Sequence, residues 1–295
     1  MKNQIAIVGT GKIAHSFSAA LKTAGYSVSL VIGKSLIHAK KFAKKFSAEL
    51  YSVELTSLED FKGLIFLAVP DSAIKEIDKQ LTKLNLKWKH ISVVHFSGSL
   101  TVDELKNIGA KGGKTGSLHI MQSFPTTKIV DIKNSFSAIE TRNLFLKRKL
   151  FSLAKELKLI PFEIKTEQKS LYHLTGIFVS NFMVANLYLA KKLFEKTSIR
   201  DVDFIDLIRP ILITTQKNIL SNGIENSISG PIERGDFRTI KSHINKLKKE
   251  KAFNELNAFL IMSKSILDMI RASAGGLTEG QLLIEKELLF SIKRG

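Results

Sequence analysis

The chain has 295 residues, of which 44% are hydrophobic and 24% charged, so the composition predicts a globular protein with room for two domains. It contains no cysteine, which excludes disulfides, zinc–thiolate sites and thiol nucleophiles. The formal net charge is +18 at pH 7, but the lysines are spread over many segments and do not alternate with aromatic residues. We therefore expect lysine-rich solvated helix faces and no nucleic-acid-binding surface.

A predicted apolar strand over residues 5–8 leads directly into Gly9-Thr10-Gly11-Lys12-Ile13-Ala14. This pattern is typical of the first βα unit of a dinucleotide-binding domain. The first glycine permits a tight turn, the second lets the backbone approach a pyrophosphate, and the following helix directs its N-terminus at the phosphates. Glycine turns after strands are also common without a ligand, so this motif alone is a weak predictor of the cofactor.

Strands and helices alternate up to about residue 165. Strands are predicted at residues 27–32, 49–53, 63–69, 91–96, 117–120, 135–139 and 159–164, with helices over most of the connections. The run 63–69 is apolar almost throughout, as expected for a parallel strand that is buried on both faces. We predict a doubly wound, mostly parallel α/β Rossmann sheet over residues 1–165, with Asp71 as the cap of one helix.

Beyond residue 165 the strand pattern ends, and residues 166–295 are predicted to form an all-helical domain for substrate binding and dimerisation. Helices are expected over residues 168–196, 200–222, 238–248, 250–273 and 279–292. The apolar stretch 174–190 is interrupted by Asn181 and Asn186 and is shorter than the roughly 20 residues of a membrane-spanning helix. We expect it to be a buried helix in a cytoplasmic protein that does not bind membranes.

The loops at the carboxyl ends of parallel strands predict where a dinucleotide binds. The second strand lacks the terminal acidic residue that usually holds the adenosine ribose, and Gly33-Lys34-Ser35 offers a cation and a hydroxyl for a 2′-phosphate instead. We therefore expect NADP in preference to NAD, with an ordinary polar turn as the alternative. The predicted cofactor-binding residues are Gly9, Thr10, Gly11, Lys12, Ile13, Gly33, Lys34, Ser35, Val69, Pro70 and Ser97.

Two histidines are candidates for proton transfer. His119 follows a predicted strand at the nicotinamide end of the expected cofactor site, and His173 lies early in the first long helix. With about 100° per residue, Lys169, Ile177 and Ser180 share the helix face of His173, and Asn181 lies about 80° away. Any of the polar side chains among these could equally make a structural hydrogen bond.

Arg234 lies in the turn Gly230-Pro231-Ile232-Glu233-Arg234-Gly235-Asp236 between two predicted helices. In that position it could bind an anion, or it could form a solvent-exposed salt bridge in an ordinary turn. The histidines show no ligand spacing, so no metal site is predicted.

Several longer motifs accompany the glycine turn across almost the whole chain. They are Leu67-Ala68-Val69-Pro70-Asp71, His95-Phe96-Ser97-Gly98-Ser99, Ser117-Leu118-His119, Gln122-Ser123-Phe124-Pro125, Tyr172-His173, Ser180-Asn181, Gly230-Pro231 and Arg234-Gly235-Asp236. Together they resemble Rossmann-like proteins with a C-terminal helical domain of unknown function, related to pyrroline-5-carboxylate reductase and the 6-phosphogluconate and 3-hydroxyacid dehydrogenases. The resemblance implies an N-terminal cofactor domain, a helical domain that pairs two subunits, and an active site between the two domains.

The residues and the resemblance together predict an NADP-dependent oxidoreductase for a small carbonyl, imine or hydroxy-acid compound. His173 or His119 would donate the proton, Asn181 and Ser180 would hold the substrate, and Arg234 would bind a carboxylate. In the related hydroxyacid dehydrogenases a lysine stands four residues before the helix asparagine, where this chain has Ile177. That difference favours the alternative, a dimeric sensor or scaffold that binds a dinucleotide without catalysis.

Overall fold

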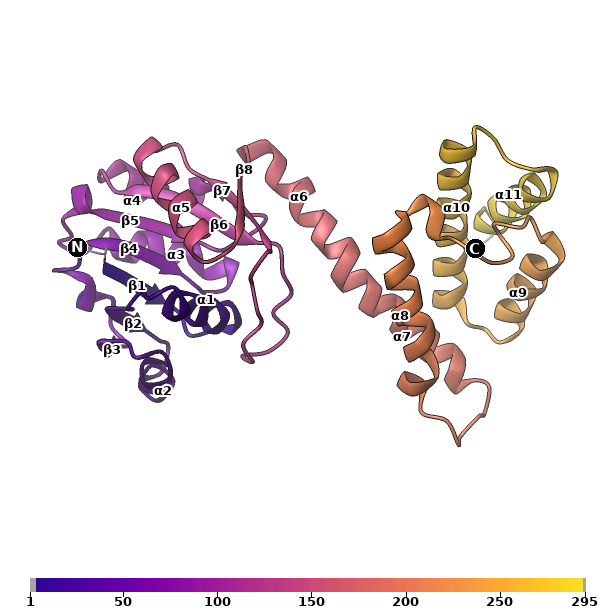
Figure 1. Cartoon of the computed structure of the whole chain (residues 1–295), viewed down its shortest axis with the longest axis horizontal. Helices are drawn as coiled ribbons and strands as arrows, with labels where there is room; N and C mark the ends of the chain where they lie inside the picture. The colour runs from indigo at the N-terminus through magenta and orange to yellow at the C-terminus, as the bar shows by residue number, and fades with distance from the viewer. Residues whose placement is uncertain (1–3, 294–295) are drawn as a thin grey trace. The chain divides into compact units, whose positions relative to one another are not determined.

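The computed structural model describes residues 4–293, and its N-terminal part is built on one eight-stranded sheet (Figure 1). The strands lie in the order β3-β2-β1-β4-β5-β6-β7-β8. The first six are parallel, β7 is antiparallel to β6, and β8 is parallel to β7. The predicted mostly parallel Rossmann sheet is therefore confirmed. The strands are β1 (Gln4–Val8), β2 (Leu30–Ile32), β3 (Leu50–Ser52), β4 (Gly63–Leu67), β5 (Ile91–His95), β6 (Lys114–Ile120), β7 (Phe136–Glu140) and β8 (Ile160–Glu163).

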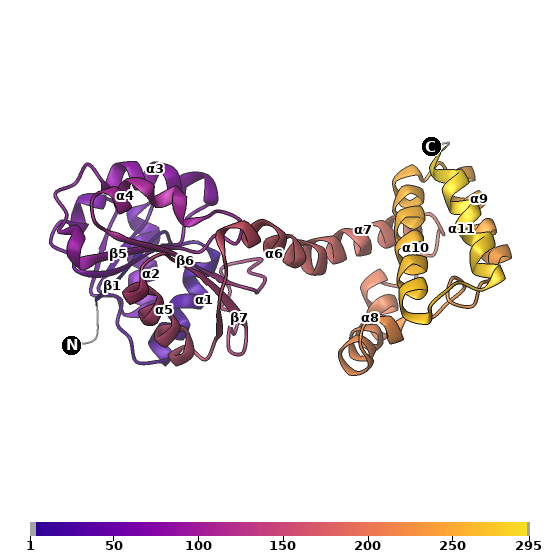
Figure 2. The same cartoon turned by 90° about the horizontal axis from the view of Figure 1, so that it is seen from above.

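Helices cover both faces of this sheet (Figure 2). One face packs against α1 (Lys12–Thr23), α2 (Leu36–Phe46) and α5 (Leu144–Glu156), and the other against α3 (Asp71–Leu81) and α4 (Lys106–Ala110). Successive side chains of a strand point to opposite faces, so a strand between two helical layers must be apolar at every position.

Strand β1 follows that rule. Ile5 and Ile7 enter the core on the α1 side, and Ala6 and Val8 enter the core on the α3 side. The second core also contains Trp88, the chain's single tryptophan, which is buried beside the start of β5. Two separate cores thus fix the sheet from both sides and hold the carboxyl ends of its strands in place.

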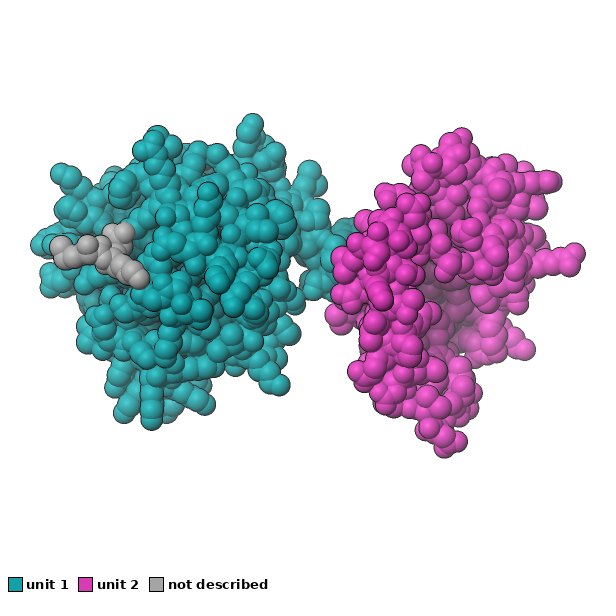
Figure 3. Space-filling view, viewed as in Figure 1, with its two compact units in different colours: residues 1–181 teal, residues 182–295 magenta. Residues whose placement is uncertain are grey.

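The chain divides into two compact units, Met1–Asn181 and Phe182–Gly295 (Figure 3). The first unit contains the sheet, helix α6 (Lys169–Gly176) and a π-helical turn, Ile177–Asn181. The domain boundary predicted at residue 165 therefore precedes this division by one helix.

The regular elements of the second unit, among its described residues, are all helices, and its core is formed mainly by α9, α10 and α11. Gly235 lies so close to α11 that a Cβ on Gly280 would come within 2.4 Å of the Gly235 carbonyl oxygen. A capping box begins the last helix, because Thr278 and Gln281 each bond to the other's backbone N–H. The helices are α7 (Phe182–Glu195), α8 (Phe204–Asn222), α9 (Phe237–Lys249), α10 (Phe253–Ala274) and α11 (Glu279–Ile292).

The first long helical stretch is not buried within the single chain, so this expectation was wrong. Val179 is 74% exposed and Val184 63% exposed. By length and composition alone, Thr166–Glu195 could cross a membrane, which is weak evidence because core helices pass the same test. Apolar composition predicts that a helix is covered, but it does not distinguish cover by the chain itself from cover by a partner.

Candidate functional site

The turn after β1 requires glycine at its first position. Gly9 has a φ of +102°, and a Cβ there would lie 2.3 Å from the Ala68 carbonyl oxygen. Its N–H donates to the Ile32 carbonyl at 2.7 Å. No residue with a side chain can occupy this position without moving β4, so Gly9 is explained by the fold itself.

Gly11 is different, because the protein leaves room for a side chain there. Its φ is −77°, which any residue can adopt, and a Cβ on Gly11 would lie 3.6 Å from its nearest neighbour, the Ala68 carbonyl oxygen. Packing within the chain therefore gives no reason for a glycine. Close approach of a ligand to the backbone at the N-terminus of α1 would give one.

A cleft of about 1090 Å³ lies beside this turn, within the first unit. Its walls are the ends of β1, β2 and β4, the first turn of α1, much of α2 and α3, and residues that follow β3 and β6. The lysines in its lining, Lys34, Lys41 and Lys45, all come from the end of β2 and from α2. The cleft can therefore accept an extended, negatively charged ligand whose charge is greatest near α2.

Two histidines in the cleft were not recognised from the sequence. His15 and His38 both line it, and Nδ1 of His15 donates to the Gly11 carbonyl at 3.0 Å. The His15 ring lies edge-on to Phe42, with 4.9 Å between the ring centroids. Their positions in the first turns of the helices after β1 and β2 were the available signal, because those turns face the ligand edge of the sheet.

The predicted cofactor residues fall into two groups. Those in the cleft lining are Gly9, Thr10, Gly11, Gly33, Lys34, Val69 and Pro70. Those outside it are Lys12, Ile13, Ser35 and Ser97. Lys12 is exposed, and Ser35 occupies the N-cap position of α2. Thr127, from the connection between β6 and β7, also lines the cleft and was not predicted to do so.

Ser97 has a structural role that involves Asp71. Its hydroxyl donates to the Asp71 carboxylate at 2.6 Å and accepts from the Leu100 N–H at 2.9 Å. Asp71 was predicted to cap α3, but Pro70 holds the N-cap position, and Asp71 is the first helical residue. The carboxylate instead fixes the loop after β5, which carries Gly98.

The structure brings the two candidate histidines together. The rings of His119 on β6 and His173 on α6 lie 5.7 Å apart between centroids, at 74° to each other. A Cβ on Gly98 would lie 2.4 Å from Cδ2 of His173 and 2.7 Å from Nε2 of His119. Tyr172 bonds through its hydroxyl to Nδ1 of His119 at 3.0 Å. Three segments thus meet at one polar cluster, and Gly98 is the contact that lets the rings approach.

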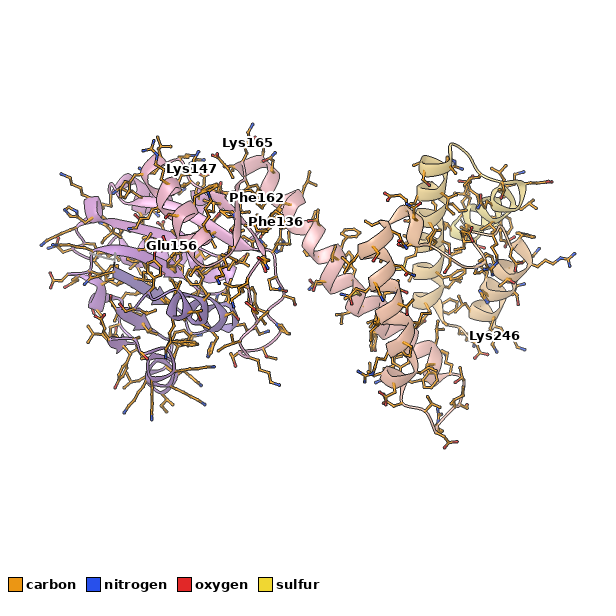
Figure 4. The ribbon with its side chains drawn as sticks, in the orientation of Figure 1. Phe136, Lys147, Glu156, Phe162, Lys165 and Lys246 are labelled. Carbon is orange, nitrogen blue, oxygen red and sulfur yellow. The ribbon has the colours of Figure 1, made fainter. Side chains whose placement is uncertain are left out.

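An aromatic row continues from this cluster toward the edge of the sheet. Tyr172 lies edge-on to Phe162 of β8 at 5.7 Å between centroids, and Phe162 contacts Phe136 of β7 (Figure 4). These rings enclose the phenol, and burial raises the pKa of Tyr172 to about 12. Tyr172 is therefore a neutral hydrogen-bonding partner for His119 at physiological pH.

Burial, together with the charges of the neighbouring His173 and Lys169, lowers the pKa of His119 to about 4. His119 is therefore an uncharged imidazole near neutral pH. His95 is uncharged for a similar reason, because burial lowers its pKa to about 3. Both of its ring nitrogens are already used, with Nδ1 accepting from the Ser97 N–H and Nε2 donating to the Thr101 carbonyl. His95 is thus a structural residue.

The π-helical turn changes which helix positions share a face. The predicted phase assumed an unbroken α-helix, but Ile177–Asn181 is π-helical and takes up about one more residue per turn. This shift moves Asn181 from about 80° to within roughly 20° of the His173 direction, and moves Ser180 away from it. Ser180 is half-buried and Asn181 is exposed.

Arg234 lies in the second unit and is exposed. The segment around it is well ordered by hydrogen bonds, since the Glu233 carbonyl accepts from the Gln281 side chain and Asp236 caps α9. Among the described residues, no group of three or more histidine, aspartate or glutamate side chains could hold a metal ion.

Two family models match the chain. Residues 4–95, from β1 to the end of β5, match the family described as NADP oxidoreductase, coenzyme F420-dependent. Residues 135–266, which extend from the start of β7 into α10, match a domain of unknown function, DUF2520. The first match contains the glycine turn and most of the cleft, and the second contains α6 with His173. No curated protein sequence matches the chain.

Solved structures with the same architecture cover nearly the whole chain. A candidate NADP oxidoreductase from Bacteroides fragilis is 23% identical, with a TM-score of 0.75 over 90% of this chain and 97% of the other. A Thermotoga maritima protein is 25% identical, with a TM-score of 0.71 over 92% and 99%. A reductive aminase from Aspergillus terreus, in complex with NADPH and ethyl-5-oxohexanoate, is 12% identical, with a TM-score of 0.67 over 97% and 99%.

Fold, glycine turn and family matches agree with one another. The N-terminal unit has a nicotinamide dinucleotide-binding fold, and its structural neighbours are reductases and dehydrogenases that include a pyrroline-5-carboxylate reductase and a prephenate dehydrogenase. The chain thus combines a match to an NADP oxidoreductase-type domain over residues 4–95 with a match to DUF2520 over residues 135–266, and the resemblance indicated by its motifs is confirmed.

Proposed function

We propose that the protein is an NADP-dependent oxidoreductase that reduces a small carbonyl or imine compound or oxidises the corresponding hydroxy acid or amine. The observation that carries this proposal is Gly11, a glycine that the protein's own packing does not require. It lies at the N-terminus of a helix and beside a cleft large enough for a dinucleotide. A polar cluster suited to proton transfer lies in the same unit.

The charge of the cleft supports NADP in preference to NAD. Lys34, Lys41 and Lys45 line its α2 side, and the carboxylate among its described lining residues is that of Glu76 on α3. A 2′-phosphate would gain charge-assisted hydrogen bonds from these lysines. The ribose diol of NAD carries no such charge, so these lysines would bind NADP more tightly than NAD.

In the proposed reaction the nicotinamide supplies or receives the hydride. His119 is uncharged at neutral pH, so we assign proton donation in the reductive direction to His173. His119 is held in place by its hydrogen bond to the Tyr172 hydroxyl. Asn181, brought toward the His173 face by the π-helical turn, would orient the substrate's polar group. Ser180, which the turn moves away from that face, remains a proposed substrate-binding residue. Arg234 remains a proposed carboxylate ligand.

The fluorescence of NADPH on binding tests the cofactor assignment. We expect saturable binding by the wild-type protein and binding at least about tenfold weaker by Gly11→Ala, because the added methyl would occupy the space of the pyrophosphate. Gly11→Ala should unfold at the same denaturant concentration as the wild type, since the protein itself has room for the methyl. Absence of saturable binding of both NADPH and NADH would refute the proposal.

The second candidate function is a dinucleotide-binding sensor without catalysis. Ile177 supports it, because an isoleucine cannot transfer the proton that a lysine transfers in the related dehydrogenases. Consumption of NADPH, followed by its absorbance with a panel of small aldehydes, ketones and cyclic imines, separates the two functions. Tight NADPH binding with no turnover of any class would favour the sensor.

We also propose that the protein acts as a homodimer through its helical domain and is cytoplasmic. Large apolar side chains are exposed on one face of α8, including Ile205 at 54%, Ile213 at 57% and Leu220 at 80%. Soluble monomers rarely expose a contiguous apolar surface of this kind, and a second copy of the same face would cover it.

A further inference from the structure

A lysine ion pair lies buried beneath the histidine cluster. Lys169, the first residue of α6, is 1% exposed, and its ammonium donates to the Ser117 hydroxyl at 2.6 Å and to the Ser97 carbonyl at 3.3 Å. Its charge is paired with the Glu140 carboxylate at 3.2 Å. A buried lysine is costly unless it is paired and hydrogen-bonded, and here all three donor directions have acceptors.

The carboxylate partner is also fully engaged. Glu140, the last residue of β7, accepts from the Val102 N–H at 3.1 Å and from the Thr166 hydroxyl at 2.7 Å, in addition to its pair with Lys169. The network therefore joins the ends of β5, β6 and β7 to the start of α6. It occupies a place where any shift of α6 along the sheet would break several charged hydrogen bonds at once.

The spacing of this network matches the spacing of the histidines. Ser117 and His119 are two residues apart on β6 and face the same side of the strand, about 6.6 Å from each other along it. Lys169 and His173 are four residues apart on α6 and face the same side of the helix, about 6 Å from each other along its axis. The contact of Lys169 with Ser117 thus sets the register in which His173 meets His119.

We infer that Lys169 is a positioning residue, which fixes α6 against β6 and so holds His173 next to His119 and Gly98. The inference deepens the proposed function and rests on it in one respect, namely that the two histidines carry out the proton transfer of the proposed reaction. Its ammonium also adds a positive charge beneath His119, which favours the uncharged imidazole. Neither residue of the pair was assigned a role from the sequence, although Lys169 shares the predicted helix face of His173.

The surroundings of His119 determine how its titration should respond. The titratable and charged groups around it and around Lys169 are Tyr172, His173 and Lys169 from α6, Glu140 from β7, His95 from β5 and Asp71 from α3. Among these groups, Lys169 forms an ion pair with Glu140, so both charges of the pair can be removed together. Removing both charges avoids leaving an unpaired carboxylate in the interior.

The test uses the full-length Lys169→Met/Glu140→Gln double variant, in which glutamine retains an acceptor for the Val102 N–H. A second, milder variant is Ser117→Ala, which removes only the hydroxyl at 2.6 Å from the ammonium. The matched control is Lys149→Met, because Lys149 is another partly buried lysine of the same unit whose pKa is lowered by burial. Histidine-labelled protein gives both readouts by NMR: the titration of His119 and the nuclear Overhauser contact between the two rings.

We expect the pKa of His119 to rise in the double variant, because the Lys169 charge that lowers it is lost. The contact between the rings should weaken in the double variant and in Ser117→Ala, and stay unchanged in Lys149→Met. NADPH affinity should remain within about twofold in all three, while turnover falls at least about tenfold in the first two because the histidines lose their alignment.

The inference is overturned if both test variants are folded and keep the wild-type His119 titration and ring contact. Loss of the ring contact in Lys149→Met as well would also overturn it, because the effect would then be general. These NMR readouts need neither cofactor nor turnover. If the wild-type protein fails to bind NADPH, the proposed function fails while Lys169 is still tested.

Discussion

Gly98 lies against both histidine rings, and there is no space for a larger residue at this position. In Gly98→Ala the new methyl would lie 2.4 Å from Cδ2 of His173, so at least one ring must move. A displacement of about 1 Å at reacting groups costs roughly 100-fold in rate, so we expect turnover to fall by about that factor. NADPH binding should be retained because Gly98 does not line the cleft.

The matched control for this variant is Gly109→Ala on α4, where the added Cβ would have nothing within 4 Å. Steady-state kinetics and NADPH titration of both variants, with their denaturation midpoints, give the comparison. If Gly98→Ala turned over substrate at the wild-type rate, the present arrangement of the His119 and His173 rings would not be required for catalysis.

Buried neutral histidines predict how stability depends on acid. The pKa of His95 is lowered to about 3, so between pH 6.5 and pH 3 the unfolded chain binds a proton that the folded chain does not. The free energy of unfolding should therefore fall as the pH falls through this window, by on the order of 1 kcal/mol per pH unit for this group. Urea unfolding at several pH values measures the slope, and a slope as steep in His95→Gln as in the wild type would contradict the assignment.

The β2–α2 element determines the predicted cofactor preference. In Lys34→Asp we expect NADPH affinity to fall about 10- to 100-fold and NADH affinity to change little, because a charge-assisted bond to the 2′-phosphate is replaced by repulsion. Lys44→Asp on α2 is the control, since Lys44 is exposed but does not line the cleft. Titrations of both cofactors against both variants provide the measurement. Equal losses for NADPH and NADH would argue against a phosphate at Lys34.

The regular elements could be predicted from the sequence because buried parallel strands leave a local signal. The stretch 63–67 is apolar and fully buried, and the glycine turn after β1 identifies the first βα unit. The reversed direction of β7 has no such signal, because direction depends on which neighbour a strand pairs with. The π-helical turn Ile177–Asn181 was also missed, since it depends on how the helix accommodates its surroundings and not on residue type.

The site could be predicted only as separate candidates. His119 and His173 were each identified from their positions beside predicted elements, but their contact depends on the register of α6 against β6. That register is set by Lys169 and Glu140, whose residue types suggest solvent exposure. Long-range pairing of two charges leaves no pattern in a single sequence.

At the scale of the whole molecule, the exposed apolar face of α8 predicts self-association. We expect the wild-type protein to sediment as a dimer, and Ile213→Glu/Leu220→Glu to sediment as a single chain, because buried charges at a subunit interface are costly. Ile37→Glu on α2 is the control, since Ile37 is 77% exposed but belongs to the first unit. Analytical ultracentrifugation distinguishes the states. A monomeric wild-type protein would refute the dimer.

The single tryptophan provides a spectroscopic label for one unit. Trp88 is buried in a core of the first unit, and the second unit contains none. Its emission should therefore report only the melting of the sheet, whereas far-ultraviolet circular dichroism also reports the helices of the second unit. If the two units unfold independently, the two signals will give different midpoints for the same sample, and their separation measures the coupling between the units without any added probe.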